Sequence, residues 1–357
     1  MPKVTVNFGS GRPGGIDITL AGLTAQTFKD FEVIFVDGRY HQRHSAVLEA
    51  VRKSGLQQPF YHVPNHRYRS DSLGQHSAGY NTGFMLAAGE MIVMLHDYAY
   101  APPHWLMSHV TNQDKKITLG PVESRVISNV ITNDGLPPMN FFNRNNIDGI
   151  SFPAALGNIL RQRERYDEIS AFRKPFTPDD LASFSFDTLS ADPKVSMPSG
   201  PSTHMFFNTK NEAFPTEAIL AVNGMDENSD RACIPGDLDL GLRLSRHLMA
   251  TPWLVNEAIL YCINPRSIMP KPINVMNPRD PLPPPYENYL SSEGGGYAYY
   301  ERIAANPQIL RAPNPFEIQE RKKEIWHWRE MSLLPEAVIP KNSIADCDYY
   351  KTGVESL

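Results

Sequence analysis

Three glycines and one carboxylate are spaced as they are in sites that bind a nucleotide. Gly9, Gly11 and Gly14 form the pattern Gly-x-Gly-x-x-Gly between a predicted strand and a predicted helix, and Asp37 ends the next predicted strand. Glycines in such a turn let the backbone approach phosphate groups, and a carboxylate at that strand end can accept hydrogen bonds from ribose hydroxyls. The pattern favours a nucleotide site over a plain glycine-rich turn, and it does not distinguish NAD(P) from a nucleotide sugar.

Alternating strands and helices surround this pattern. Short apolar runs predict buried strands, and apolar residues with a period of 3.6 predict helices between them. The expected strands are 3–8, 31–36, 60–63 and 91–95, and the expected helices are 16–26, 46–53 and 78–88. Such alternation indicates parallel βαβ units, so we expect an α/β sandwich with helices on both faces of a central, mainly parallel sheet.

The later segments are less regular. Apolar spacing predicts helices at 159–169, 237–248 and 316–331, and a strand at 252–261. Prolines crowd residues 265–285, and proline is excluded from central strands. We therefore expect an irregular, Pro-rich C-terminal extension, folded either as a strap over the sheet or as a lid over a cleft.

Composition narrows the class of protein. The 357 residues are 41% hydrophobic and 20% charged, which fits a globular protein and excludes a disordered chain. The formal net charge of -5 argues against a partner that is a nucleic acid. No run is long and apolar enough for a transmembrane segment, and the three cysteines lie far apart. The expectation is a cytoplasmic protein without disulfides.

Five further stretches are similar in order and spacing to the motifs of one family. They read QTFKDFEVIFVD at 26–37, NTGFMLAAGEMIVML at 81–95, PPHWL at 102–106, GMDE at 224–227 and GDLDLGLRL at 236–244. Together they resemble family 2 glycosyltransferases, the inverting enzymes of GT-A type, over residues 3–262. No resemblance covers the rest of the chain.

The resemblance implies a fold and an activity. The expected fold is a single GT-A domain with a nucleotide-sugar-binding half at 1–110, an acceptor-binding half at 111–262 and the extension at 263–357. The expected activity is that of a hexosyltransferase-like enzyme, which moves a sugar from a nucleotide-diphosphate donor to an acceptor hydroxyl with inversion. The implied partners are the donor and a carbohydrate or other hydroxyl acceptor.

The resemblance also assigns residues to the donor. Asp37 matches the acid that contacts the base or ribose, and Asn81 lies on the helix that faces the nucleotide. Asn81 could equally be a satisfied polar group on a buried helix. The turn that would hold the nucleotide consists of Gly9, Ser10, Gly11 and Arg12.

Asp237 is the expected catalytic base. The family places an acidic pair at a helix start facing the acceptor, and here Gly236 replaces the first acid. A helix N-terminus stabilises a charged carboxylate, which suits a base that begins deprotonated. The alternative is that Asp237 merely caps the helix. Asp239 is expected to support or cap rather than to react.

The metal site departs from the family pattern. The resemblance implies an acidic triplet that binds Mg²⁺ or Mn²⁺, but the sequence reads His96-Asp97-Tyr98. One hypothesis keeps a divalent cation on Asp97 and the donor phosphates, with His96 as a second ligand. The other is a metal-independent site in which Arg or Lys, such as the cluster at residues 66–69, neutralises the diphosphate.

Two other functions stay open at this point. An NAD(P)-dependent oxidoreductase would explain the glycine spacing and Asp37, but not the motifs at 81–95 and 224–244. The altered triplet would also suit a non-catalytic homologue that binds a nucleotide or carbohydrate.

Overall fold

A computed structural model describes part of the chain. The described residues are 2–10, 16–38, 40–67, 76–97, 99–125, 199–203, 207, 209–227, 236–263, 304–336 and 339. The predicted helix at 159–169 and the Pro-rich run at 265–285 lie outside them.

The described residues form short strands and helices in alternation. The strands are β1 (Val4–Ser10), β2 (Phe31–Asp37), β3 (Phe60–Pro64), β4 (Met91–Met94), β5 (Ala99–Tyr100), β6 (Thr118–Leu119), β7 (Val122–Arg125), β8 (Gly200–Pro201), β9 (Glu212–Pro215), β10 (Trp253–Leu254) and β11 (Leu260–Ile263). The helices are α1 (Ile16–Thr24), α2 (Tyr40–Ser54), α3 (His76–Leu86), α4 (Trp105–Thr111), α7 (Thr216–Ala221), α9 (Gly236–Leu248), α11 (Ile318–Ile325) and α12 (Trp328–Met331), with a 3-10 turn at Gln113–Lys115.

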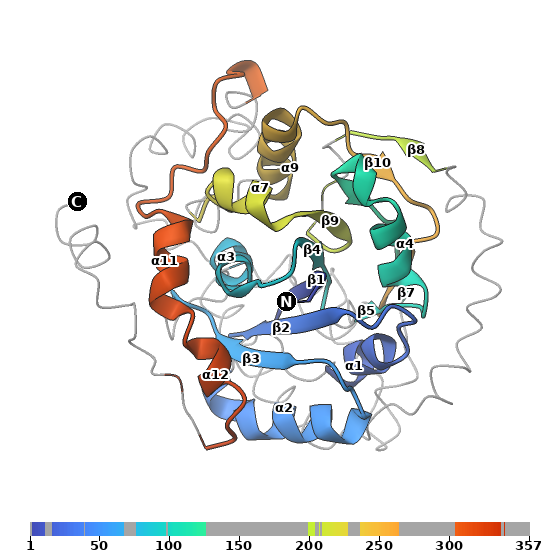
Figure 1. Ribbon diagram of the computed structural model, residues 1–357, viewed down its shortest axis with the longest axis vertical. Helices are drawn as coiled ribbons and strands as arrows, with labels where there is room; N and C mark the ends of the chain where they lie inside the picture. Colours follow the sequence, from blue (N-terminus) through green and yellow to red (C-terminus); the bar gives the residue numbers. More distant parts are fainter. Residues whose placement is uncertain are drawn as a thin grey trace, which may run out of the picture.

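Eight of these strands form the central sheet, in the order β3-β2-β1-β4-β9-β6-β10-β8. The strands β3, β2, β1 and β4 run parallel, while β9 is antiparallel to both of its neighbours. A smaller sheet joins β5, β11 and β7. Helices lie on both sides of the central sheet (Figure 1). The predicted fold class, an α/β sandwich around a mainly parallel sheet, is confirmed.

The predicted elements of the first half are found with shifted ends. The largest shift is in α2, which begins at Tyr40, although the apolar pattern predicted a start at residue 46. The extra turn is polar in sequence, yet Tyr40 and His44 are buried in it by contacts with β3. Tertiary packing rather than local periodicity fixes this helix start.

The single strand predicted at 252–261 is wrong. The segment forms two short strands, β10 in the central sheet and β11 in the smaller one. A turn separates them, in which the Ala258 amide donates to the Val255 carbonyl at 3.1 Å. The chain needs this turn because β10 pairs with β6 and β11 pairs with β7, in different sheets.

Apolar side chains cover both faces of the parallel strands. On β2, Ile34 and Val36 pack on one side with α3, and Phe31, Val33 and Phe35 pack on the other. Side chains alternate between faces along a strand, so burial on both sides requires the continuous apolar run that the sequence shows.

The described part of the C-terminal extension packs on the domain. The predicted helix at 316–331 is broken at residues 326–327 into α11 and α12, and Ile318, Ile325 and Trp328 are buried beneath it. Both helices lie beside α3 and β3 (Figure 1). This packing favours the strap over the lid for residues 304–336.

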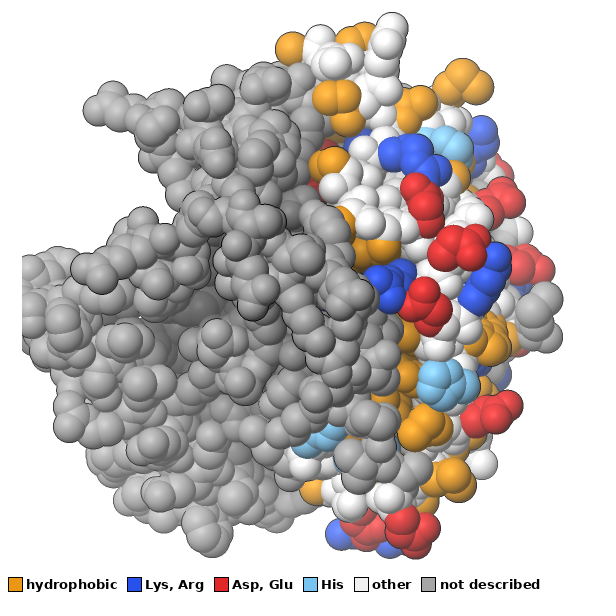
Figure 2. All heavy atoms as spheres, turned by 90° about the vertical axis from the view of Figure 1, so that its left-hand side faces the viewer, with side chains coloured by type: hydrophobic (Ala, Val, Ile, Leu, Met, Phe, Trp, Pro, Cys, Tyr) orange, Lys and Arg blue, Asp and Glu red, His pale blue; other side chains and the backbone are white. Residues whose placement is uncertain are grey.

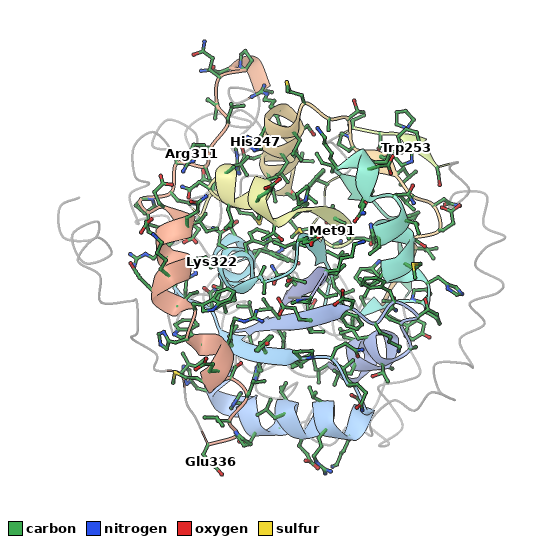
Figure 3. The ribbon with its side chains drawn as sticks, viewed as in Figure 1. Met91, His247, Trp253, Arg311, Lys322 and Glu336 are labelled. Carbon is green, nitrogen blue, oxygen red and sulfur yellow. The ribbon has the colours of Figure 1, made fainter. Side chains whose placement is uncertain are left out.

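Cationic side chains fasten this strap to the body. Lys322, labelled in Figure 3, donates to the Ala87 carbonyl at the end of α3 at 2.7 Å. Arg329 pairs with Glu32 of β2 and lies 4.0 Å from the Tyr61 ring. Arg311 donates to the Ala221 carbonyl of α7 at 2.9 Å. On this side of the molecule, basic and acidic side chains are interspersed over the described surface, and they form no large patch of a single charge (Figure 2).

None of the helices in the described part of the chain combines the length and the apolar composition that crossing a membrane requires.

Candidate active site

The carboxyl ends of β1, β2 and β4 bring three predicted site residues to one edge of the sheet. Ser10 pairs with Asp37 in the register of β1 and β2. Asp97 follows β4, whose Met94 pairs with Asn7 of β1. Ligands of open α/β sheets bind outside this edge, where the loops after the strands meet.

Asp97 is held in place by its neighbours. Ser10 Oγ donates to Asp97 Oδ2 at 2.7 Å, and His96 Nδ1 lies 2.6 Å from the Asp97 carbonyl oxygen and 3.2 Å from Oδ1. Ser10 thus ties the glycine turn to the position of the altered triplet. Gly9 is the second-to-last residue of β1, whereas Gly11 and Arg12 lie outside the described residues.

Asp37 is fully buried at the end of β2. Its Oδ2 lies 2.8 Å from Nε2 of His62, which comes from the adjacent strand β3. The predicted nucleotide-contacting acid is therefore set beside a buried imidazole, and its orientation is fixed before any ligand arrives.

Asn81 binds the segment that reads GMDE. Its Oδ1 accepts from the Met225 amide at 2.8 Å, and its Nδ2 donates to the Met225 carbonyl at 2.9 Å and to Glu227 Oε1 at 3.0 Å. Gly224 has a φ of 68° and lies so close to Asn81 that a Cβ there would be 2.3 Å from Oδ1. The geometry favours the alternative in which Asn81 is a satisfied structural group.

The basic cluster before α3 is also engaged. Arg67 Nη1 donates to Glu227 Oε2 at 3.1 Å, and His66 Nε2 lies 3.1 Å from Glu227 Oε1. Burial alone would raise the pKa of Glu227, but His66, Arg67 and Asn81 lower it to about 2. Glu227 therefore acts as an anionic anchor that joins the loop before α3 to the GMDE segment, while residues 68 and 69 lie outside the described part.

Asp237 lies in the first turn of α9, which begins one residue earlier at Gly236. Its Oδ1 accepts from the Leu238 amide at 3.0 Å. Burial raises the pKa of Asp237, and this outweighs the opposing effects of backbone hydrogen bonds and of Lys210. The expectation that the helix end favours the charged form is therefore wrong in its net direction, because desolvation is the larger effect.

Asp239 has a structural role. Its carboxylate pairs with Arg243 one turn later at 2.6 Å, and both side chains are buried. Arg243 Nη1 also donates to the carbonyls of Val222 and Gly224 at 2.9 and 2.8 Å. This pair fixes α9 against the turn after α7 and thereby sets the position of Asp237.

Lys210 lies close enough to Asp237 for its charge to act on that carboxyl group, and sequence reasoning missed it. The preceding Thr209 has a φ of 56°, and its carbonyl accepts from Tyr80 of α3 at 2.6 Å. Two residues further back, Phe207 packs on α9 so closely that a Cβ at Gly241 would lie 2.6 Å from its ring. The segment is thus held between the starts of α3 and α9.

The charge of Lys210 acts on groups of both helices. On α9, it partly opposes the rise that burial causes in the pKa of Asp237. On α3, it contributes to lowering the pKa of His76. His76 Nε2 lies 3.2 Å from Thr209 Oγ1.

The metal hypothesis can be tested against the donor set. No group of three or more His, Cys, Asp or Glu that could hold an ion occurs among the residues that the structure describes. Mg²⁺ and Mn²⁺ prefer oxygen ligands. Asp97 offers one carboxylate, which already accepts from Ser10, and His96 Nδ1 is turned towards Asp97 itself. These residues do not fit an ion held by the protein alone.

A comparison with protein families bears on the donor side of the site. Residues 10–170 match the family model described as Glycosyl transferase family 2, which is somewhat less than half of the chain. The predicted resemblance is confirmed. The GT-A type that it implied agrees with the mainly parallel sheet described above. The match includes Asp37 and Asp97 but ends before Lys210 and Asp237, so the acceptor side rests on this chain's own geometry.

Solved structures give weak likenesses. S. aureus TarS 1–349 in complex with UDP shares 11% identity, covering 92% of this chain and 71% of that chain, with a TM-score of 0.46. The mannosyltransferase PcManGT from Pyrobaculum calidifontis, in complex with GDP-Man and Mn²⁺, shares 13% identity, covering 98% and 80%, with a TM-score of 0.45. Both scores are below 0.5, so the fold assignment rests on the sheet described above. No curated protein matches the sequence.

Proposed function

We propose that this protein is an inverting glycosyltransferase that moves a sugar from a nucleotide-diphosphate donor to an acceptor hydroxyl. One observation carries the proposal: Ser10, Asp37 and Asp97 meet at the carboxyl edge of the parallel strands, where the glycine turn also lies. The family match over residues 10–170 supports the donor half of this site. The comparisons give no support to the oxidoreductase alternative.

The donor lies across the carboxyl ends of the parallel strands. The Asp37 carboxylate accepts hydrogen bonds from N–H groups of the base or hydroxyls of the ribose. Asp97, oriented by Ser10, lies at the same edge on the other side of β1 and accepts a hydrogen bond from a ribose hydroxyl. Held in this way, the anomeric carbon is fixed relative to the acceptor side, and positioning supplies much of the acceleration.

Asp237 is the base for the acceptor. Its carboxylate takes the proton of the acceptor hydroxyl as the oxygen attacks the anomeric carbon. The bond to the sugar forms as the bond from that carbon to the diphosphate oxygen breaks, and the electron pair leaves with the diphosphate. A single displacement from the opposite side inverts the anomeric centre. The raised pKa of Asp237 makes it a stronger proton acceptor once it is ionised.

Lys210 neutralises the charge that develops on the leaving diphosphate. A fixed cation next to a developing anion lowers the barrier because no solvent must reorganise during the reaction. Two hypotheses followed from the sequence: a divalent cation on Asp97 and the donor phosphates with His96 as a second ligand, or a basic residue. Lys210 takes the second role in this proposal. The residues of the cluster at 66–67, in contrast, are bound to Glu227.

The division of the domain is part of the proposal. We assign residues 1–110 to the donor half, 111–262 to the acceptor half and 263–357 to the extension. In support, β1 to β4 come from the first stretch, while β9 and α9, which flank the segment of Lys210, come from the second.

Nucleotide binding tests this function. With UDP, GDP, dTDP, NADH and NADPH each added in excess, we expect at least one nucleoside diphosphate to raise the unfolding temperature. A ligand at a hundred times its Kd adds about 2.7 kcal/mol to the free energy of unfolding. A shift with NADH or NADPH alone would support the oxidoreductase. Binding without transfer or donor hydrolysis would support the non-catalytic homologue.

A further inference from the structure

The Asp37 carboxylate begins a chain of four polar groups, of which the three side chains are buried. His62 Nε2 lies 2.8 Å from Asp37 Oδ2, and His62 Nδ1 lies 2.9 Å from His44 Nδ1. His44 Nε2 lies 3.3 Å from the carbonyl oxygen of Leu334. Asp37 and His62 are fully buried and His44 is 7% exposed, so bulk water does not shield these contacts.

Aromatic packing fixes both imidazoles. Phe35 of β2 stacks on His62 with ring centres 5.1 Å apart, and the ring plane of His44 of α2 lies within 21° of that of His62, with ring centres 5.0 Å apart. Tyr40 packs on His44 at 4.6 Å and on His62 at 5.0 Å. The ring nitrogens therefore point along the chain and have little freedom to turn away.

A count of protons shows what an ionised Asp37 requires of the two histidines. Three contacts link the four groups, and each requires one proton between its two heavy atoms. With Asp37 ionised, two neutral imidazoles supply only two ring protons, so one contact would join two acceptors. All three contacts are then satisfied when His44 and His62 share three ring protons, that is, when one of them is an imidazolium.

The extra proton belongs on His62. Burial lowers the pKa of His44, with only partial compensation from the Leu334 carbonyl and Asp37. His62 instead lies directly against the Asp37 carboxylate, where its positive charge is paired. It donates Nε2–H to Asp37 and Nδ1–H to His44, while neutral His44 donates Nε2–H to Leu334.

We propose that His62 and His44 are positioning residues for donor binding, which hold the Asp37 carboxylate ionised and oriented and connect it to the C-terminal strap at Leu334. A buried carboxylate without such a partner tends to take up a proton, which would replace an acceptor by a donor. Base N–H groups and ribose hydroxyls require an acceptor. This role rests on the proposed function, because it assumes that Asp37 meets the nucleoside of the donor.

The strap is part of the arrangement. Leu334 follows α12, which is anchored through buried Trp328 and through Arg329 on Glu32. Beyond it, the Ile339 amide donates to Tyr40 Oη at 3.3 Å. The strap thus contacts both His44 and the Tyr40 ring that packs on it.

Donor affinity in a His44→Phe variant is the main test. An aromatic ring remains to pack on Tyr40, while both nitrogens are lost. We expect the Kd and KM for the nucleotide donor to rise about tenfold, the loss for a hydrogen bond to a charged group, with kcat at saturating donor changed less than about twofold. A merely structural role would lower thermal stability without this split between KM and kcat.

Two further variants sharpen the result. His327→Phe, on the exposed outside of the strap, makes the same exchange and should leave Kd unchanged. His44→Asn restores a polar group near His62 Nδ1 but cannot reach Leu334. We expect it to recover donor affinity to within about threefold of wild type, since the bond to His62 is the one that matters for Asp37. It remains informative if His44→Phe fails to fold.

The proton assignment has a readout that needs no donor. Nitrogen NMR of the histidine rings should show both nitrogens of His62 protonated at pH 7. A neutral His62, or unchanged donor affinity in His44→Phe, would overturn the role of the pair while leaving the glycosyltransferase intact. If the wild-type protein binds no nucleoside diphosphate, the proposed function fails and this role fails with it.

Discussion

Replacing Asp237 with Asn is expected to lower kcat for transfer by about 10²- to 10⁴-fold, the range of a lost general base. Asn keeps the size and the polar contact with the Leu238 amide but cannot take the acceptor's proton. Donor affinity should stay close to that of wild type, because the donor lies against the strand edge and not on this carboxylate. Steady-state transfer and nucleotide titration measure the two quantities.

The same residue sets the acid limb of the pH profile. Because burial raises the pKa of Asp237, the ionised base is present above that raised value and is lost as the pH falls through it. The rate should therefore decline with acid at a pH above the ordinary range of an Asp. Asp114→Asn, at an exposed site in the 3-10 turn, is the matched control. An Asp237→Asn enzyme with near-normal turnover would remove Asp237 from this role.

Replacing Lys210 with Met is the second change with a large expected effect. We expect kcat to fall by about 10²- to 10³-fold, as for loss of one preorganised group that stabilises developing charge. Lys210→Arg keeps the charge and should recover part of the rate. Lys53→Met, on the exposed face of α2, is the control.

Removal of metal ions tests the alternative to Lys210, in which a bound cation neutralises the diphosphate. Because Lys210 supplies the positive charge, wild-type transfer should survive EDTA. If EDTA abolishes transfer, Mn²⁺ restores it and Lys210→Met has no effect, a bound ion and not Lys210 neutralises the diphosphate.

The order of elements on the donor side could be predicted from the sequence because each is an uninterrupted local signal. The run FEVIFV can be buried on both faces only as a central strand, and β2 occupies that place. That the glycine turn and Asp37 lie close together could also be predicted, because the carboxyl ends of parallel strands meet at one edge of the sheet. Asp237 was identified because the segment GDLDLGLRL resembles a family motif, while its leucines, which repeat with the helical period, predicted the helix.

Contacts between distant segments could not be predicted in this way. Lys210 lies in an irregular segment without a motif, and contacts of its neighbours with Tyr80 and Gly241, distant in sequence, show where it is held. Glu227 reads as part of a family motif, but its partner Arg67 is 160 residues away. The polar start of α2 carries no periodic signal, although it places His44 beside His62.

The central claim is that the donor spans the carboxyl ends of the early strands and faces Asp237 across its diphosphate. A crystal structure with the nucleoside diphosphate that binds most tightly tests it most directly. The account predicts the nucleoside at Asp37, the ribose at Asp97 and the diphosphate within reach of Lys210. A nucleotide bound elsewhere, or one whose diphosphate points away from Lys210 and Asp237, would contradict it.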